Sequence, residues 1–321
     1  AIGSGGGRQG RNDRIAKLLA EADKEAPGGG SSADAAQAVS AGKVTVGAGD
    51  EESCVCCIPP LRAHREPAAA SIFTFQFGSV TVHQLSDAGV TCDAAWMFPS
   101  LNALELEAGF PEGRAVLSFG CVLFRCANGT TVLCDTSVGA PDLGVINLEV
   151  HTEQRKRRQL LELLGAVGLS PEDITVVTHS HMHRDHHSWN VIGGTPTFPN
   201  AIHLIQRAEF AYWTSTAELK ERSGYAATIQ PLEAAGKLHL VDGTYDVCDG
   251  FRLELCPGHT PGHQLVRVSA MPVADELPCS PPAMYVVGDL LHQTQQVTHP
   301  EWSPRFDWSA AAAASIRAAV L

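Results

Sequence analysis

Alternating apolar and polar residues predict several strands in the first half of the chain. Residues 72–77 alternate phenylalanine with polar side chains, and residues 80–85 continue a strand-like pattern, as half-buried strands do. A second hairpin is predicted between residues 115–124 and 130–135, because Asn128 and the glycine after it favour a tight type I′ turn. Antiparallel strands in series therefore predict a sheet that begins near residue 72.

The second half of the chain alternates helical and strand-like patterns. Residues 152–167 place leucines at helical spacing and predict a helix, and residues 173–178 form a β-branched run that predicts a buried strand. An alanine-rich helix is predicted from Trp308 onward. The other predicted elements are a helix over residues 207–214 and strands over residues 201–205, 238–241, 251–255 and 285–287. This mixture of strands and helices predicts an α/β protein of the α+β type.

Residues 1–70 differ in composition from the rest of the chain. They are rich in glycine, alanine and serine, with a flexible linker at residues 28–32, and we expect disorder apart from one helix over residues 13–26. Residues 71–321 are expected to form the folded domain. The chain starts without a methionine and stops inside a helical pattern, so we expect a processed or incomplete sequence that lacks the C-terminal part of the domain.

Composition and charge narrow the function classes. Of the 321 residues 44% are hydrophobic, enough for a sizeable core, and the net charge of −12 argues against a nucleic-acid or anionic-membrane partner. No apolar run reaches the length of a membrane span, about 18 residues, which favours a soluble protein and slightly favours the cytoplasm. The 10 cysteines are scattered and predict no disulfide framework, so compartment and oligomeric state stay open.

A dense run of histidines follows the predicted buried strand. Residues 179–187 contain five histidines and one aspartate, and imidazole is a common neutral metal ligand. His181 and His183 point to one side of an extended segment, while Asp185 and His186 lie past the turn and can point to a second position. Two-metal hydrolytic sites need this arrangement. The alternative interpretation is a solvated histidine-rich loop or a disordered metal-chelating tract.

Two later loops carry further candidate ligands. Residues 256–263 combine proline and glycine in a tight turn that can present His259 rigidly. Asp289 follows the strand predicted over residues 285–287, and a carboxylate at a strand tip can bridge two cations. Together with the histidine run, three loops at the ends of three strands predict one metal site.

The spacing of these residues resembles the metallo-β-lactamase superfamily of metal-dependent hydrolases. The likeness rests on His-x-His-x-Asp-His at residues 181–186, Gly-His-Thr-Pro-Gly-His at residues 258–263 and Gly288-Asp289, and extends over residues 72–310. Shorter matches resemble the branch of lactonases and methyl parathion hydrolase-like enzymes; they lie at residues 98–99, 189–190, 196–201, 207–209 and 288–292. The resemblance implies a four-layer αβ/βα sandwich in which helices flank two mixed β-sheets.

The resemblance also implies a ligand set and a chemistry. The six expected ligands of two zinc ions are His181, His183 and His259 for the first ion, Asp185 and His186 for the second, and Asp289 between them. A hydroxide held between the metals would attack a carbonyl or phosphoryl centre of a small-molecule substrate. Asp185 would be the catalytic residue that orients this hydroxide and handles the proton. Iron and manganese are alternative metals.

Other polar residues near the motifs are expected to support the site. By the resemblance, His263 is a neighbour rather than a ligand, and Asp135 supports the metal loops from behind. His179 and His187 do not fit the motif spacing and are expected to be bystanders. Ser137 stands where the family usually has glycine.

One ligand implied by the resemblance has no counterpart. The superfamily supplies a further histidine to the second metal late in the chain, whereas only His292 and His299 follow Asp289, and both come too early. We expect His292 to pack beside the site and His299 to lie in a loop. The hypothesis is that the chain stops before the missing ligand and holds its second metal weakly.

Three functions stay open. The leading interpretation is a metal-dependent hydrolase that cleaves an ester, lactone or phosphotriester bond. The alternatives are a mononuclear iron dioxygenase that acts on persulfides and a non-catalytic, metal-impaired relative that serves as a binding module. The acidic balance of the chain disfavours a nuclease.

Overall fold

The computed structural model describes residues 72–139, 152–154, 159–269 and 283–321. The arm expected over residues 1–70, with its helix, lies outside the described residues. Among the helices that the structure does describe, none is both long and apolar enough to cross a membrane.

Among the residues that the structure describes, the first sheet is mixed and contains eight strands. They are β1 (Ile72–Phe77), β2 (Val80–Asp93), β3 (Arg114–Arg125), β4 (Thr131–Cys134), β5 (Thr152–Gln154), β6 (Val176–Thr178), β9 (Ile202–Gln206) and β10 (Leu238–Val241). The strand order is β1-β2-β3-β4-β6-β9-β10, and β5 pairs with β2 at the side. Neighbours from β1 to β4 are antiparallel, whereas β4, β6, β9 and β10 run parallel.

The second sheet packs face to face on the first. Its strands are β11 (Thr244–Cys248), β12 (Phe251–Leu255), β13 (Gln264–Ser269) and β14 (Ala283–Val286). All of these described neighbours are antiparallel, so this sheet differs in detail from the mixed one expected. Phe124 of β3 meets Phe251 of β12 edge to face, with ring centroids 5.0 Å apart. Both belong to one buried cluster that joins valines and leucines of the two sheets and forms the central core.

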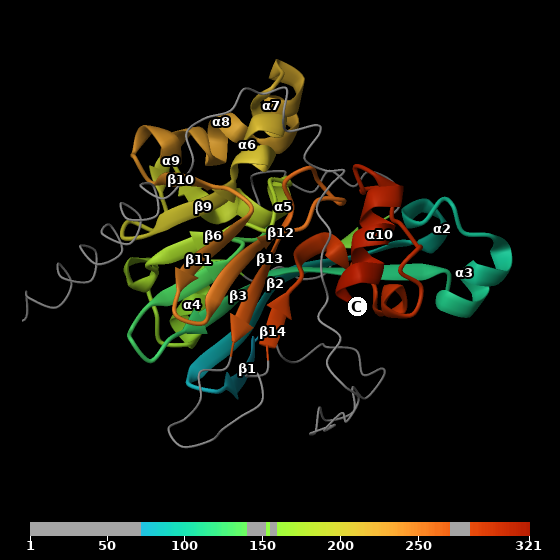
Figure 1. The fold of residues 1–321 in the computed structure, drawn as a ribbon, viewed down its shortest axis with the longest axis horizontal. Coiled ribbons are helices and arrows are strands. Elements are labelled where there is room, and N and C mark those ends of the chain that lie inside the picture. The colour runs from blue at the N-terminus through green and yellow to red at the C-terminus, as the bar shows by residue number, and fades with distance from the viewer. Residues whose placement is uncertain (1–71, 140–151, 155–158, 270–282) are drawn as a thin grey trace, which may run out of the picture. The chain divides into compact units, whose positions relative to one another are not determined.

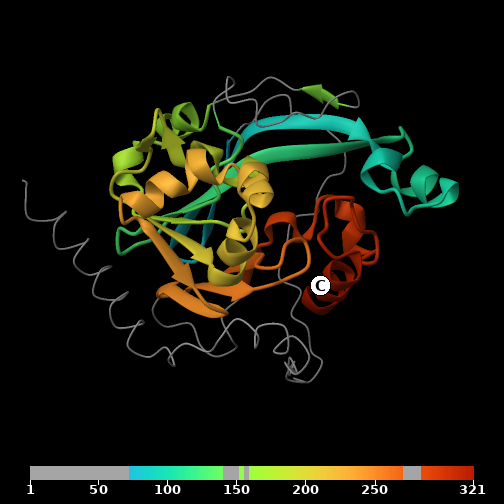
Figure 2. The ribbon, with the colours of Figure 1, turned by 90° about the horizontal axis from the view of Figure 1, so that it is seen from above.

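Helices cover the outer faces of the two sheets (Figure 1, Figure 2). α4 (Leu160–Ala166) packs Leu160 and Leu164 against Leu133 and Val177 on the far side of the first sheet. α10 (Ala310–Val320) places Ile316 against a small cluster with Leu265 of β13. The order helix, sheet, sheet, helix confirms the four-layer sandwich.

Short helices surround the histidine run and the parallel edge of the first sheet, in the upper part of Figure 1. They are α5 (Arg184–His187), α6 (Arg207–Thr214), α7 (Ala217–Ser223), α8 (Tyr225–Thr228) and α9 (Gln230–Ala234), and a small hairpin of β7 (Val191–Ile192) and β8 (Thr195–Pro196) lies among them in the chain. Trp213 and Ile229 from this group pack with Met182 of the histidine run and Ile205 of β9. The run is therefore enclosed by packed structure and is not a solvated loop.

Strands β2 and β3 continue past the sheet as a two-stranded ribbon, which Figure 2 shows running out to α2 (Ala94–Met97) and α3 (Ala103–Gly109). We call residues 86–119 the β2–β3 arm. A separate apolar cluster holds its end, where Phe98 stacks on Phe110 with centroids 5.3 Å apart and Trp302 lies 6.2 Å from Phe110. The C-terminal segment of the chain thus packs against the tip of the arm.

The predicted elements agree with the structure in most places, but several boundaries differ. The helix predicted over residues 152–167 begins only at Leu160, where its leucine stripe begins, because Thr152–Gln154 pairs with β2 as strand β5. The strand predicted over residues 173–178 is shorter, since a 3-10 turn capped by Ser170 and Asp173 occupies its first position.

Candidate metal centre

The histidine run is held at the edge of the first sheet where the parallel strands β4 and β6 end. Asp135, just after β4, accepts two hydrogen bonds of 2.8 Å from Ser180, one from the backbone N–H and one from the hydroxyl. Ser180 in turn accepts a 2.9 Å bond at its carbonyl from the backbone N–H of Gln264 at the start of β13. The run is thereby fixed between the two sheets, so its side chains are presented at the sandwich edge.

Four candidate ligands converge on one position. His181, His183, His259 and Asp289 each offer one ligand atom, and these atoms all lie within 4.8 Å of one another. His183 Nδ1 is 2.9 Å from His181 Nε2 and 3.0 Å from His259 Nε2. Asp289 Oδ2 is 3.3 Å from His259 Nε2. Tetrahedral ligands of one zinc ion lie roughly 3.3 Å apart for bonds near 2.0–2.1 Å, so this set fits a zinc-sized ion.

The other two candidate ligands lie on the opposite side of Asp289. His186 Nε2 is 3.3 Å from Asp289 Oδ1 and 3.7 Å from Asp185 Oδ2. The second nitrogen of His186 is 2.9 Å from Asp135 Oδ2, which orients the ring. Asp289 thus presents one carboxylate oxygen to each group of side chains, and this is the geometry that a bridging ligand requires.

The metal-free site favours cations. Burial lowers the pKa of His181, His183 and His259 well below the usual value, so these imidazoles are neutral, as metal ligands must be. Burial also works against a charged His186, but Asp289, Asp135 and Asp185 outweigh it and raise the pKa of His186 well above its ordinary value. The three carboxylates around His186 thus favour positive charge at this position.

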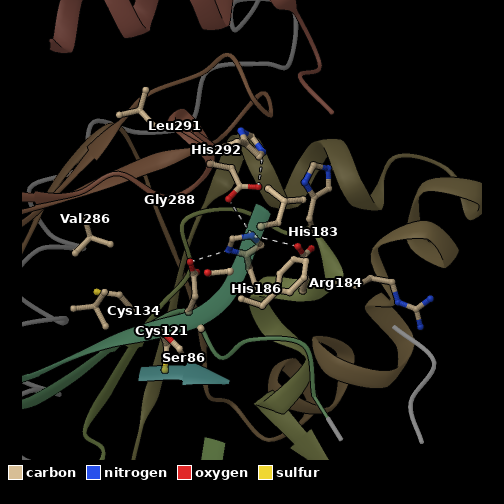
Figure 3. Close-up of a pocket in the computed structure, with 18 of the residues that line it drawn as sticks. Ser86, Cys121, Cys134, His183, Arg184, His186, Val286, Gly288, Leu291 and His292 are labelled. Carbon is tan, nitrogen blue, oxygen red and sulfur yellow. Dashed lines mark hydrogen bonds and ion pairs between the residues drawn. The ribbon is translucent and has the colours of Figure 1, made fainter. Parts of the chain in front are cut away.

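His292 and His299 take different positions. His292 is nearly buried, and its Nε2 lies 3.1 Å from Asp289 Oδ2, beside the candidate ligands. Figure 3 shows its ring facing the same pocket as His183 and His186. His299 is about half exposed, lies 3.2 Å from Glu301 and stacks on Trp302. It points to the surface and does not reach the cluster of described ligands.

The surplus histidines serve as buried packing groups. His179 Nε2 contacts His203 Nδ1 at 3.2 Å, and His187 bonds to the carbonyl of Met182 at 3.2 Å and to Thr228 at 2.9 Å. Burial lowers the pKa of His187 to about 4, and burial together with Lys237 lowers that of His203 to about 3. These rings stay neutral behind the metal loop, and among the described residues they join no ligand cluster.

Two acidic residues near the site were not assigned a role from the sequence. Buried Glu209 of α6 accepts hydrogen bonds of 2.8 Å from the backbone N–H groups of Met182 and Gly262, and so ties two metal loops together. Asp307 lies 3.0 Å from His259 Nδ1. Glu209 lies in a short family-like match, which is a weak signal, whereas nothing in the local sequence marks Asp307.

A cavity of about 650 Å³ opens over the candidate ligands. Asp185, His186, Asp289 and His292 lie in its lining, and Leu117, Phe119, Leu291 and Phe306 are among its apolar wall residues. Arg184, Arg222 and Arg305 line other parts of it, and Figure 3 shows Arg184 directed away from the histidines. The cavity can therefore hold a small molecule with an apolar part next to the metal position.

Comparison with known proteins identifies a family to which the central part of the chain is similar. The family model described as the metallo-beta-lactamase superfamily matches residues 121–273. These residues, which hold most of the candidate ligands, are therefore similar to the metallo-β-lactamase superfamily. The match includes the histidine run and the loop of His259, and the order of these motifs agrees with the sandwich and with the place of the site at its edge.

The curated relatives with similar sequences are lactonases. An N-acyl homoserine lactonase of Bacillus cereus is 29% identical over 168 residues, which are 49% of this chain and 61% of that protein. The lactonase AttM of Rhizobium radiobacter is 34% identical over 120 residues, 35% of this chain and 43% of that protein. The chain thus spans about three fifths of the length of the first of these relatives.

Two solved structures share the fold. A probable metal-dependent hydrolase from Staphylococcus aureus superposes with a TM-score of 0.64 at 19% identity, covering 76% of this chain and 84% of the other. AidC, a dizinc quorum-quenching lactonase in complex with its product, superposes with a TM-score of 0.63 at 22% identity, covering 78% and 85%. At these identities the likeness concerns the architecture only.

Proposed function

We propose that this protein belongs to the metallo-β-lactamase superfamily and is a metal-dependent hydrolase that opens lactones, with related esters or phosphotriesters as further substrates. The observation that carries the proposal is Asp289, which directs one oxygen toward His259 and the other toward His186. The lactonase relatives support the substrate class. The cavity of about 650 Å³ beside the ligands supports a small-molecule substrate.

The proposed ligand set divides the six residues between two positions. His181, His183 and His259 would hold one zinc ion, Asp185 and His186 the other, and Asp289 both. Bound zinc supplies a Lewis acid and lowers the pKa of water to about 7. We expect the first position to bind zinc more tightly than the second, because three histidine nitrogens are available there. Each of these nitrogens lies within 3.8 Å of Asp289 or of another of the three.

Asp185 is the candidate for proton handling. Its side chain is 29% exposed and lines the cavity, so a carboxylate oxygen can reach a bound substrate. Burial raises the pKa of Asp185 above the ordinary value for aspartate. His186, 3.7 Å away, keeps the carboxylate beside the metal position.

The proposal is tested with purified chain and a substrate panel. We expect metal analysis to find zinc in the wild type, with turnover of lactones or aryl esters. His181→Ala should lower kcat/KM by more than about 100-fold, which exceeds the usual effect of an outer partner of a metal ligand. His299→Ala is the matched control, since it removes a half-exposed histidine outside the cluster.

Each competing function has its own outcome. Bound iron together with oxygen uptake in the presence of a persulfide would support the dioxygenase. Tight metal binding without hydrolysis of any panel member would support the binding module. A chain that neither binds metal nor hydrolyses a substrate would rule out the proposal.

A further inference from the structure

His259 is held from behind by a buried acid. Its Nε2 faces His183 Nδ1 at 3.0 Å, while its Nδ1 lies 3.0 Å from Asp307 Oδ1. The side chains of His259 and Asp307 are 1% and 0% exposed. A neutral imidazole has one N–H, and a carboxylate at Nδ1 can only accept it, so Nε2 keeps its lone pair for a metal.

Asp307 is in turn paired with a buried arginine of α10. Its second oxygen lies 3.1 Å from Arg317 Nη1, and both side chains are fully buried. Arg317 also donates from Nε to the carbonyl of Pro300 at 2.7 Å, and from Nη2 to the hydroxyl of Ser303. Every guanidinium nitrogen has a partner, so the charge of Arg317 is compensated and its position is fixed.

Backbone contacts lock the same two segments together. The N–H of Trp308 donates to the carbonyl of His259 at 2.9 Å, and that of Ser309 donates to the carbonyl of Gly258 at 3.2 Å. A Cβ on Gly258 would lie 2.7 Å from Ala313 Cα, so the turn of residues 258–259 sits directly on α10. The helix that covers the second sheet is therefore also in contact with the metal loop.

We propose that Asp307 and Arg317 are positioning residues that hold His259 in the tautomer and orientation needed to bind metal. The inference rests on the metal site of the proposed function but not on the identity of its substrate. Without Asp307 the ring of His259 is free to turn or to place its proton on Nε2, and either change removes a ligand. Without Arg317 the buried carboxylate loses its charge partner and no longer stays in place as an anion.

A purely structural role for the pair makes a different prediction. In that case loss of the pair would lower the stability of the fold and leave the metal affinity of the folded protein unchanged. The two roles separate in Asp307→Asn, which keeps the size of the side chain, and in the double variant Asp307→Asn/Arg317→Gln, which removes both charges. Asp246→Asn is the matched control, because it makes the same substitution in an aspartate–arginine pair, Asp246–Arg252, that is not among the candidate ligands.

The experiment uses the full chain and measures zinc affinity by competition with a chelator, the visible spectrum of the cobalt form, and the thermal midpoint without metal. We expect Asp307→Asn to weaken zinc binding by about 10–100-fold, the usual effect of losing such a partner, and to change the cobalt spectrum. The double variant should be more stable without metal than Asp307→Asn, yet bind zinc equally weakly. Asp246→Asn should bind zinc as the wild type does.

The failures are distinguishable. Zinc affinity of Asp307→Asn within a factor of two of wild type, or equal weakening in Asp246→Asn, would overturn this inference whether or not the chain hydrolyses lactones. If Asp307→Asn does not fold, Asp307→Glu replaces it in the test, because this variant keeps the carboxylate. Asp307→Glu should then bind zinc more tightly than the double variant, and the reverse order of affinities would overturn the inference. Zinc binding without hydrolysis would refute the proposed function and leave the positioning role intact.

Discussion

Two residues behind the metal loop adopt a backbone conformation that is costly for any side chain. Asp135 has φ of 61° and Ser137 has φ of 56°, and among the described residues they are the only non-glycine ones with positive φ. Asp135 needs this conformation to hold Ser180 and His186 at once. Ser137 has no such task, since its buried hydroxyl has no hydrogen-bond partner.

We predict that Ser137→Gly stabilises the protein. Glycine reaches positive φ without strain, and the change also removes a buried unpaired hydroxyl. Each of these two effects should raise the free energy of unfolding by about 1–3 kcal/mol. The extra conformational entropy that glycine gives to the unfolded chain opposes them. We expect a net gain of about 1 kcal/mol in the free energy of unfolding by urea. Ser188→Gly, at φ of −73°, is the control and should destabilise. A lower free energy of unfolding for Ser137→Gly than for wild type would refute the claim that the backbone at Ser137 is strained.

At the scale of residues, the sequence predicts the candidate metal ligands but not the side chains that hold those ligands in place. The six candidate ligands sit in three short motifs whose spacing is local, so they can be named without a structure. Asp307 is different, because it reaches His259 across 48 residues through a fold that a single sequence does not specify. Ser137 is an intermediate case. The family resemblance shows that glycine is usual at this position, but only the positive φ in the structure explains why glycine is favoured there.

The elements were predicted well where one face is buried and poorly elsewhere. β13 was missed because Gln264–Ser269 directly follows a turn rich in glycine and proline and carries Arg267 among its valines. β2 was predicted to end at Leu85, yet it continues to Asp93 through a register shift between Ser86 and Ala88. The polar and glycine residues of the extension resemble a loop, and only pairing with β3 makes them a strand.

The contact between α10 and the turn of His259 leads to a prediction at the scale of elements. Gly258→Ala places a Cβ 2.7 Å from Ala313 Cα and 2.9 Å from Ala313 N, which are backbone atoms of the helix and do not rotate away. We expect α10 to shift and the free energy of unfolding to fall by about 1–3 kcal/mol, as for other overpacked sites.

Gly165→Ala is the matched control for this glycine. Gly165 lies inside α4 and a Cβ there would meet no atom within 4 Å. Alanine favours a helix over glycine by about 0.5–1 kcal/mol, so this variant should be more stable than wild type. Urea unfolding of both variants measures the difference, and equal effects would show that α10 is not seated on the turn.

On the scale of the whole molecule, the buried histidines set the response to acid. Burial lowers the pKa of His187 and of His263 to about 4, and burial together with Lys237 lowers that of His203 to about 3. The unfolded chain binds protons at these residues below pH of about 6.5, whereas the folded chain does not. Stability is therefore fully present above that pH and is lost as the pH falls toward 4.

We predict the size of this loss for one histidine. Each such residue destabilises the fold by up to about 1.4 kcal/mol per pH unit below 6.5, so His203 accounts for about 2 kcal/mol between pH 7 and pH 5. The test compares wild type and His203→Gln, both treated with chelator, by urea unfolding at pH 7 and pH 5. Between these pH values the free energy of unfolding should fall by about 2 kcal/mol less in His203→Gln than in wild type. Equal losses in the two proteins would contradict a neutral buried His203.

The β2–β3 arm and the segment after Asp289 form one connected wall of the cavity. Gln293 donates to the carbonyl of Val116 and Gln295 to that of Gly109, each at 2.7 Å. Leu117 and Phe119 of the arm line the cavity opposite the ligands' own loops. Substitutions at Leu117 or Phe119 therefore reshape the cavity wall without changing any candidate metal ligand. We expect such substitutions to change which substrates are accepted more than they change metal binding.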